Sequence, residues 1–191
     1  MDGKIKVGLI YGSTRKGRFC DKVATWVAGE ILSSGHFTLE TIDPAAPLPE
    51  REENSRSSKV SASLWHSVAQ ADAYVVVTPE YNHGYPAPLK SLIDSFNAEW
   101  HAKPVAFVSY GGVSGGLRAV EQLRQVFAEL HTVTIRDAVS FASAWELFDE
   151  AGKLLEPERP RRSMATLLAQ LHWWAIALRT ARDEVPYAPA A

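Results

Sequence analysis

The residues best suited to chemistry in this sequence come directly after its most apolar run. The segment "AYVVVT", residues 73–78, leads into a polar and aromatic stretch at residues 79–86. Its two rings, Tyr81 and Tyr85, suit the face of a planar ligand, while the Asn82 amide and nearby backbone groups suit the edge of a heterocycle. The alternative is a proline-bounded turn that carries surface rings. The composition favours a platform for a flat, polar ring system.

A second candidate lies near the N-terminus, where "GSTRKGR" (residues 12–18) separates an apolar segment from an amphipathic one. Backbone N–H groups at a helix start, the Ser13 hydroxyl and the guanidinium groups of Arg15 and Arg18 suit a phosphate group. An ordinary basic turn between a strand and a helix is the alternative. The stretch has neither the G-x-x-x-x-G-K-[ST] pattern of a P-loop nor the G-x-G-x-x-G pattern of a dinucleotide fold, which excludes both classes of nucleotide site.

A third loop, "YGGVSGG" (residues 110–116), is rich in glycine. Gly111 and Gly112 have no side chain that would keep a ligand away from the backbone. Taken alone, a flexible turn is the simpler interpretation of this loop. The argument for a ligand therefore depends on all three loops together.

Other reactive side chains show no spacing that is typical of a site. No arginine follows Cys20 at the spacing of a phosphatase loop, and the apolar run ends in Thr-Pro instead of the aspartate of a phosphoacceptor domain. The histidines lack metal-ligand spacing, so no metal site is expected. For His83, inside the aromatic stretch, a substrate contact and a surface position both stay open. We expect a packing role for Cys20 and a core or interface role for Trp173 and Trp174.

Hydrophobic periodicity predicts strands and helices in regular alternation. Short apolar runs predict strands at residues 4–10, 37–43, 73–78, 103–110 and 131–139. Apolar positions three and four residues apart predict helices at residues 19–34, 58–71, 89–96, 116–130 and 158–182. Residues 44–57 and 140–157 are predicted to be irregular, and the tail from Val185 to be loose.

This alternation is typical of a doubly wound α/β fold with a parallel sheet. The unbroken β-branched run at 73–78 supports it, because strands of a parallel sheet are buried on both faces. Such sheets bind ligands beyond the carboxyl ends of their strands. Each of the three loops follows a strand, so we expect all of them at one edge of a single domain over residues 1–191, with its core from about 4 to 182.

The bulk composition restricts the functional classes. The 191 residues carry a net charge of −2 at pH 7, from 20 basic and 22 acidic side chains, so no nucleic-acid or membrane-surface partner is expected. One cysteine excludes an intrachain disulfide and fits a reducing compartment. No apolar run approaches the ~20 residues of a membrane span, and the first one is too short for a secretory signal. We therefore expect a cytoplasmic protein with small-molecule ligands.

Together, the three loops resemble those of the NADPH-dependent FMN reductase family, a flavodoxin-like group that includes chromate, quinone and azo-dye reductases. The matching stretches are "GSTRKGR", "ADAYVVVTPEYNHGYPAPLKSLIDSF" and "KPVAFVSYGGVSGG", and the resemblance covers residues 4–140. The second stretch is the most specific, with P-E-Y-N followed by P-x-x-L-K-x-x-I-D. Ser91 departs from the pattern, since the family often has Asn after Leu-Lys. A capping or bracing role is expected there, with little effect on activity.

The resemblance implies a flavodoxin-like sheet of five parallel strands in the order 2-1-3-4-5, with helices on both faces and FMN as the cofactor. The phosphate of FMN would lie on residues 13–19, and its isoalloxazine between residues 79–82 and 111–112. The residues assigned to FMN in this way are Ser13, Arg15, Arg18, Phe19, Pro79, Glu80, Tyr81, Asn82, Gly111 and Gly112. A homodimer or homotetramer is also implied. Because an acid is unusual in a ligand-facing loop, we expect Glu80 to pair with an arginine of a neighbouring subunit.

By the same resemblance, the cofactor carries the chemistry. NADPH or NADH would donate electrons first, and a quinone, azo compound, chromate or free flavin would then accept them at the same open face, in ping-pong order. No catalytic side chain is required, and the Gly111–Gly112 backbone is expected to stabilise negative charge on the reduced ring. The alternative is a non-enzymatic electron carrier or redox sensor, although flavodoxin-type carriers are usually much more acidic than this chain.

Overall fold

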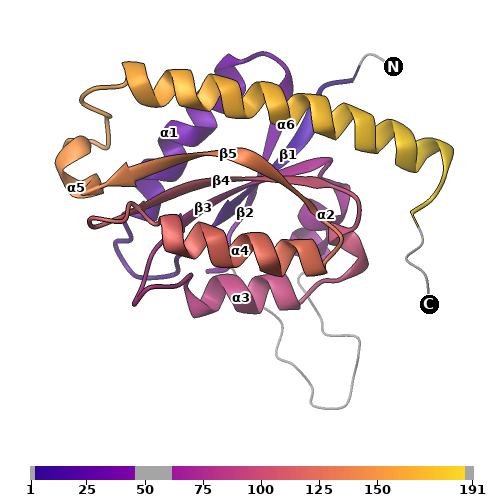
Figure 1. Cartoon of the computed structure of the whole chain (residues 1–191), viewed down its shortest axis with the longest axis horizontal. Coiled ribbons are helices and arrows are strands. Elements are labelled where there is room, and N and C mark those ends of the chain that lie inside the picture. The colour runs from indigo at the N-terminus through magenta and orange to yellow at the C-terminus, as the bar shows by residue number, and fades with distance from the viewer. Residues whose placement is uncertain (1–2, 46–61, 188–191) are drawn as a thin grey trace.

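The computed structural model describes residues 3–45 and 62–187, which are organised around a parallel β-sheet (Figure 1). The strands are β1 (Ile5–Tyr11), β2 (Phe37–Ile42), β3 (Ala73–Pro79), β4 (Pro104–Gly111) and β5 (Val133–Ala142). They lie in the order β2-β1-β3-β4-β5, and each neighbouring pair is parallel. The predicted doubly wound sheet and its strand order are confirmed.

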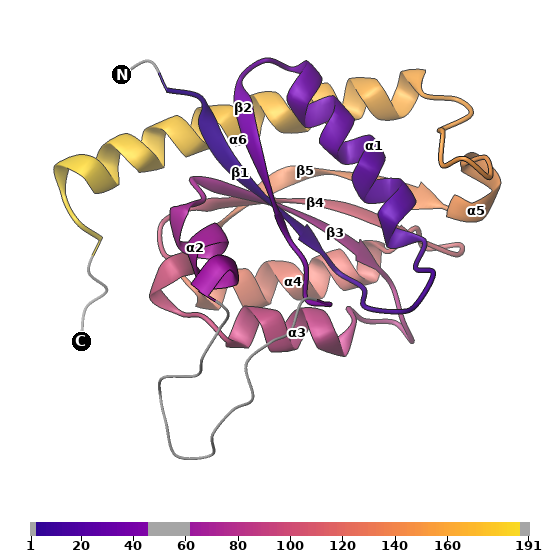
Figure 2. The same ribbon diagram turned by 180° about the vertical axis from the view of Figure 1, so that it is seen from behind.

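Helices cover both faces of the sheet (Figures 1 and 2). They are α1 (Cys20–Ser33), α2 (Ala62–Gln70), α3 (Ala87–Asp94), the 3-10 helix η1 (Ala98–Trp100), α4 (Leu117–Glu129), α5 (Ala144–Leu147) and α6 (Glu158–Glu184). Helices α1 and α6 share one hydrophobic core with the sheet, and α2, α3 and α4 share the other. Two cores therefore flank the sheet.

Strand β3 fills both cores at once. All seven of its residues are buried. Ala73, Val75 and Val77 belong to the core under α1 and α6, whereas Tyr74 and Val76 belong to the opposite core. Successive side chains of a strand point to opposite faces, so a strand that is covered on both sides needs a continuous apolar run.

Trp100 lies at the centre of the second core. Its side chain is fully buried and meets the rings of Tyr74 and Phe127 edge to face, with centroids 4.7 and 5.6 Å away. The indole N–H donates to the carbonyl oxygen of Ile93 at 3.0 Å, which satisfies its one polar group. Trp100 therefore links η1 to the sheet and to two helices of this face.

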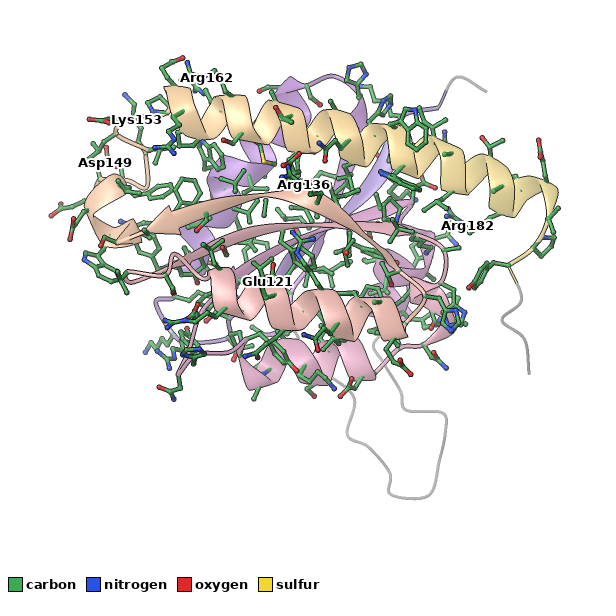
Figure 3. The ribbon with its side chains drawn as sticks, viewed as in Figure 1. Glu121, Arg136, Asp149, Lys153, Arg162 and Arg182 are labelled. Atoms are coloured by element: carbon green, nitrogen blue, oxygen red, sulfur yellow. The ribbon has the colours of Figure 1, made fainter. Side chains whose placement is uncertain are left out.

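The amino edge of the sheet is fastened to the end of α6. Arg179 pairs with Asp72 at 3.2 Å, and Arg182 donates a hydrogen bond to the Ala102 carbonyl just before β4. Figure 3 shows Arg182 near this end of α6, while Asp149 and Lys153 lie at the opposite end of the molecule. These contacts hold the edge that faces away from the predicted ligand loops.

Two predicted boundaries are wrong for identifiable reasons. The segment 140–157 is not irregular throughout, because β5 continues to Ala142 and α5 follows it. Four residues of helix are too few to show a hydrophobic period. Helix α3 begins at Ala87 instead of after Pro88, since proline is well tolerated in the first turn of a helix, where its missing N–H has no intrahelical partner.

Several predictions fall on residues that lie outside the described ranges. Of the predicted irregular segment 44–57, only Pro44 and Ala45 are described. The predicted helix start at Ser58 and the last four residues of the tail also lie outside. Across residues 3–45 and 62–187, no helix has both the length and the apolar character needed to cross a membrane.

Replacing Trp100 by alanine should lower the free energy of unfolding by about 3–5 kcal/mol, because the change removes a buried indole and leaves a cavity among aromatic rings. Trp173→Ala is the matched control, since that side chain is 63% exposed. We expect the control to lose less than about 1 kcal/mol. Urea denaturation measures both values, and similar losses in the two variants would contradict the central role of Trp100.

Candidate functional site

The parallel sheet brings three loops together at its carboxyl edge (Figures 1 and 2). They are loop 1 (residues 12–19) after β1, loop 2 (residues 80–86) after β3 and loop 3 (residues 112–116) after β4. The Ser13 hydroxyl of loop 1 lies 3.0 Å from the Tyr81 hydroxyl of loop 2. Ser114 of loop 3 donates to the Glu80 carboxylate of loop 2 at 2.8 Å. The three loops therefore form one continuous surface, as their order along the chain predicted.

Loop 1 begins with a close approach to β3 that only glycine allows. The Gly12 N–H donates to the carbonyl oxygen of Val77 at 2.7 Å. A Cβ atom on residue 12 would lie 2.7 Å from that oxygen and 2.9 Å from the Cα atom of Thr78. Both distances are shorter than side-chain carbons tolerate against backbone, so any larger residue would displace loop 1.

Tyr81 joins the two polar side chains at the start of loop 1. Ser13 is fully buried, and its hydroxyl shares a hydrogen bond with the Tyr81 hydroxyl. The guanidinium group of Arg15 lies over the Tyr81 ring, 3.7 Å from the ring centroid, in a cation–π arrangement. A hydroxyl, a cation and an aromatic ring therefore lie within one small part of the edge.

Loop 1 also presents backbone donors. In the part of the chain that the structure describes, the N–H groups of Thr14, Lys16 and Gly17 donate to no acceptor. These groups lie just before α1, a helix of 14 residues, whose N-terminal end attracts negative charge. Free N–H groups, a guanidinium and a hydroxyl are the donor set that a phosphate group requires.

Arg18, which the sequence analysis assigned to the phosphate, pairs with two carboxylates of its own chain. Its guanidinium group donates to both carboxylate oxygens of Asp43, at 2.8 and 2.5 Å, and to Asp21 at 2.7 Å. The side chain is only 11% exposed. The hydrogen bonds to Asp43 raise the pKa of Arg18, so the guanidinium group stays charged and paired with this carboxylate. Arg18 therefore braces loop 1 against the end of β2.

Phe19 and Cys20 both pack into the protein. The Phe19 ring is partly buried and lies 5.7 Å from the rings of Tyr110 and Phe148. Cys20 is fully buried, and burial raises the pKa of its thiol to about 11. A thiol that stays protonated at neutral pH is a poor nucleophile. This supports the packing role that we expected for Cys20.

Loop 2 contains a strained tight turn. The backbones of Tyr81 and Gly84 exchange two hydrogen bonds, at 2.9 and 3.1 Å. Between them, Asn82 and His83 have φ angles of 48° and 73°, in the left-handed region that residues with side chains rarely adopt. Gln122 of α4 donates to the His83 carbonyl at 2.9 Å and helps to hold this turn. Strain of this kind persists where the surrounding structure enforces it, and it is frequent at ligand sites.

Glu80 follows the buried Pro79 and directs its carboxylate to the start of α4. It accepts hydrogen bonds from the Arg118 side chain at 2.5 Å, from the Arg118 backbone at 3.2 Å and from Ser114 at 2.8 Å. Its side chain is only 5% exposed. Burial alone would raise the pKa of Glu80, but these contacts outweigh burial and lower it. Within this chain, the arginine that pairs with Glu80 is therefore Arg118, and the expected pairing across subunits stays a prediction.

The glycines around loop 3 are of two kinds. Gly115 and Gly116 have φ angles of 60° and 86°, and a Cβ atom on them would meet neighbours at 2.2 and 2.7 Å, so the fold itself requires glycine there. At Gly112, the nearest atom to such a Cβ belongs to Trp145, at 3.7 Å, which is ordinary contact. Packing therefore leaves room for a side chain at residue 112. The absence of a side chain at residue 112 fits a site where a ligand approaches the backbone closely.

Three residues at this edge escaped the sequence analysis: Asp43, Arg118 and Trp145. Asp43 ends the second predicted strand and Arg118 lies in the first turn of the fourth predicted helix, so topology alone places both at the carboxyl edge. Spacing does not reveal which acid each arginine pairs with. Trp145 belongs to the segment that was predicted to be irregular, where no periodic signal marks it.

A cavity of about 730 Å³ lies away from these loops, between α1 and α6. Its walls include Ser33 of α1 and Leu168, His172 and Trp173 of α6. None of the ten residues assigned to FMN from the sequence lines it. The donors, rings and free backbone groups converge at the carboxyl edge instead, so the candidate site is placed there.

Comparison with known proteins gives consistent matches. A family model described as NADPH-dependent FMN reductase matches residues 5–146. An NAD(P)H-dependent FMN reductase of Schizosaccharomyces pombe is 38% identical over 130 residues, which is 63% of this chain and 64% of that protein, so the match spans under two thirds of this relative. An NAD(P)H:quinone oxidoreductase of Solanum tuberosum is 33% identical over 179 residues, which is 86% of this chain and 90% of that protein.

Solved structures show the same fold. A flavoenzyme NAD(P)H:(acceptor) oxidoreductase from Paracoccus denitrificans superposes with a TM-score of 0.70 and covers 91% of this chain and 98% of that one. Its sequence is 21% identical, so the likeness concerns the fold alone.

Asp43→Asn should lower the free energy of unfolding at pH 7 by about 1–2 kcal/mol, because it leaves the poorly exposed Arg18 guanidinium with a weaker partner. Hydrogen bonds from Arg18 and Ala45 outweigh partial burial and lower the pKa of Asp43 in the folded state. A pKa that is lower in the folded state than in the unfolded state stabilises the fold at pH values above the ordinary aspartate pKa of about 4. This stabilisation disappears as the pH falls through the pKa of Asp43 in the folded state.

The difference between wild type and Asp43→Asn should therefore shrink as the pH is lowered below about 4, as measured by urea denaturation. Asp94→Asn is the control, since Asp94 forms an exposed helix pair with Lys90 and should cost about 0.3–0.5 kcal/mol. A difference that stays constant from pH 7 to pH 2 would contradict the ion pair between Arg18 and Asp43.

Glu80→Gln should lower the free energy of unfolding by about 1–3 kcal/mol, since it weakens charge-assisted hydrogen bonds to a poorly exposed group. Glu121→Gln, at a 73% exposed position of α4, is the control and should lie within about 0.5 kcal/mol of wild type (Figure 3). Because Arg118 lies in the same chain, the molar mass from light scattering should stay unchanged. If Glu80→Gln caused an oligomer to dissociate, that result would instead support a pairing of Glu80 with an arginine of a neighbouring subunit.

Proposed function

Since this chain belongs to the NADPH-dependent FMN reductase family, we propose that it binds FMN at the carboxyl edge of its sheet and oxidises NAD(P)H to reduce a quinone-type acceptor. One observation carries the proposal furthest: loop 1 combines free backbone donors with Arg15, and Ser13 connects it directly to Tyr81 of loop 2. A phosphate bound at loop 1 and a ring bound at loop 2 would thereby lie within the short distance that one cofactor spans.

The phosphate of FMN fits the donor set of loop 1. The N–H groups of Thr14, Lys16 and Gly17 would donate to its oxygens, and Arg15 would balance its charge. The buried Ser13 hydroxyl would support these donors through its hydrogen bond with Tyr81. Arg18 acts indirectly, because its pairing with Asp43 holds these donors in place.

The ring of FMN fits between loops 2 and 3. Residues 79–82 would border one side of the ring and the Gly111–Gly112 backbone the other. Within the described chain, the Gly112 N–H donates to no acceptor, so it is available to stabilise negative charge on the reduced ring. The strained turn at Asn82 and His83 fixes the polar tip of loop 2 at the outer margin of this surface.

When bound, FMN supplies the hydride chemistry between NAD(P)H and the acceptor, so the protein needs no nucleophile of its own. The protein binds and orients both substrates. Arg15 and the exposed Lys16 give the entrance positive charge, which favours phosphate-bearing donors such as NADPH. Quinones are the acceptor class that we propose, because several relatives are named quinone reductases. Azo compounds, chromate and free flavin are acceptors to compare with them.

The test starts with the purified protein, reconstituted with FMN and titrated anaerobically with NADPH. We expect visible flavin absorbance that bleaches rapidly, and parallel double-reciprocal plots when NADPH and a quinone are varied together. Arg15→Ala should raise the dissociation constant for FMN roughly 10-fold, because it removes a charge-assisted hydrogen bond. Arg136→Ala, at an 89% exposed position of β5, should leave it unchanged.

Two results would reject the proposal in different ways. Flavin that binds but is bleached by neither NADPH nor NADH would indicate a carrier or a sensor. Absence of FMN binding after reconstitution would mean that the surface formed by the three loops has another ligand.

A further inference from the structure

An indole stands beside the loop that the cofactor ring would approach. Trp145 lies on α5, and its side chain is 60% exposed. Its Cη2 atom is 3.7 Å from the position that a Cβ on Gly112 would take. The indole therefore lies next to loop 3, with more than half of the residue's surface open to solvent.

The position of this indole is built into the fold. The N–H of Ser143, directly before α5, donates to the Gly112 carbonyl at 3.0 Å, and Ser143 has a left-handed φ of 46°. On either side of Trp145, Ala144 is fully buried and Phe148 is 5% exposed. The residue before α5 is therefore bonded to loop 3, and both ends of α5 are anchored in the core. Figures 1 and 2 show α5 and loop 3 side by side.

The other exposed tryptophans in the described chain lie elsewhere. The Trp65 indole donates to Glu99, which accounts for its orientation. Trp173 and Trp174 lie on α6, and Trp173 lines the cavity between α6 and α1. Among the exposed tryptophans of the described residues, only Trp145 lies beside a loop of the candidate site.

The Cη2 edge of the indole is the part nearest residue 112, and the exposed remainder of the ring offers apolar surface to a ligand that lies beside Gly112. Aromatic rings gain from stacked or edge-to-face contact with other rings, whereas a small hydrated inorganic oxidant gains nothing from such a wall. We propose that Trp145 is a specificity-determining residue that contacts the electron acceptor and favours planar aromatic acceptors, such as quinones, over compact inorganic ones. This inference rests on the proposed function.

The test compares Trp145→Ala and Trp145→Phe with wild-type holoenzyme. For 1,4-naphthoquinone, kcat/KM should fall about 3- to 10-fold in Trp145→Ala, which corresponds to the loss of one aromatic pair. Trp145→Phe should recover most of that loss. With ferricyanide, kcat/KM should stay within 2-fold of wild type in both variants. Trp173→Ala, which removes an indole of similar exposure on α6, should match wild type with both acceptors.

Binding provides a readout that does not depend on turnover. Calorimetry with 1-naphthol, a planar ring that the enzyme does not reduce, should show an affinity that is about 3- to 10-fold weaker in Trp145→Ala. The dissociation constant for FMN should stay unchanged, because the phosphate donors lie in loop 1. Circular dichroism and urea denaturation establish that each variant is folded.

Two outcomes would overturn the role of Trp145 while the proposed function stands. One is a Trp145→Ala holoenzyme that equals wild type with naphthoquinone and naphthol. The other is an equal loss with both acceptors accompanied by weaker FMN binding, which would mean that the indole only supports loop 3. A wild-type protein that binds no FMN or reduces no acceptor would instead reject the proposed function, and the inference with it.

Discussion

The hydrogen bond from the Gly12 N–H to the Val77 carbonyl connects the first loop to the centre of the sheet, and the candidate site depends on it. The bond forms because residue 12 has no side chain to separate the two backbones. It determines where Ser13 lies, and therefore how loop 1 meets Tyr81 of loop 2. Loop 3 is joined to the same assembly through Glu80. One close backbone approach therefore sets the position of loop 1, and the contacts of Glu80 set the position of loop 3.

The arginines at the carboxyl edge of the sheet differ in role: some stabilise the loops, and one is available to bind an anion. Arg18 and Arg118 are each committed to a carboxylate, Asp43 and Glu80, and these pairs connect loops to secondary structure. Because their charges are balanced within the chain, they add little net attraction for an anion. Arg15 lies over an aromatic ring without a carboxylate partner among the described residues, so it carries the positive charge that a phosphate would meet. Each pair includes one poorly exposed charge, Arg18 or Glu80, and removing its partner would be costly, which suits both pairs to a supporting role.

The sequence was sufficient where periodicity and topology decide the outcome. The apolar run of β3 predicted a strand buried on both faces, and parallel pairing then brought the three loops to one edge. It was insufficient where long side chains choose among partners, because the pairing of Arg18 with Asp43 depends on the register of β1 beside β2 and on rotamers. It also missed α5, because four residues make only about one helical turn and a hydrophobic period cannot repeat within them. Trp145 escaped notice for that reason.

The burial of Cys20 has a consequence for how this molecule can be observed. It is the only thiol in the chain, and its Sγ atom lies 3.6 Å from the Val77 carbonyl under the first turn of α1. Quinones alkylate accessible thiolates, so a protein that reduces quinones, as we propose for this one, would be protected when its one thiol is protonated and enclosed. The same enclosure means that a thiol reagent can reach the sulfur only when α1 separates from the sheet. The labelling rate of Cys20 therefore reports local opening next to loop 1, without any added probe.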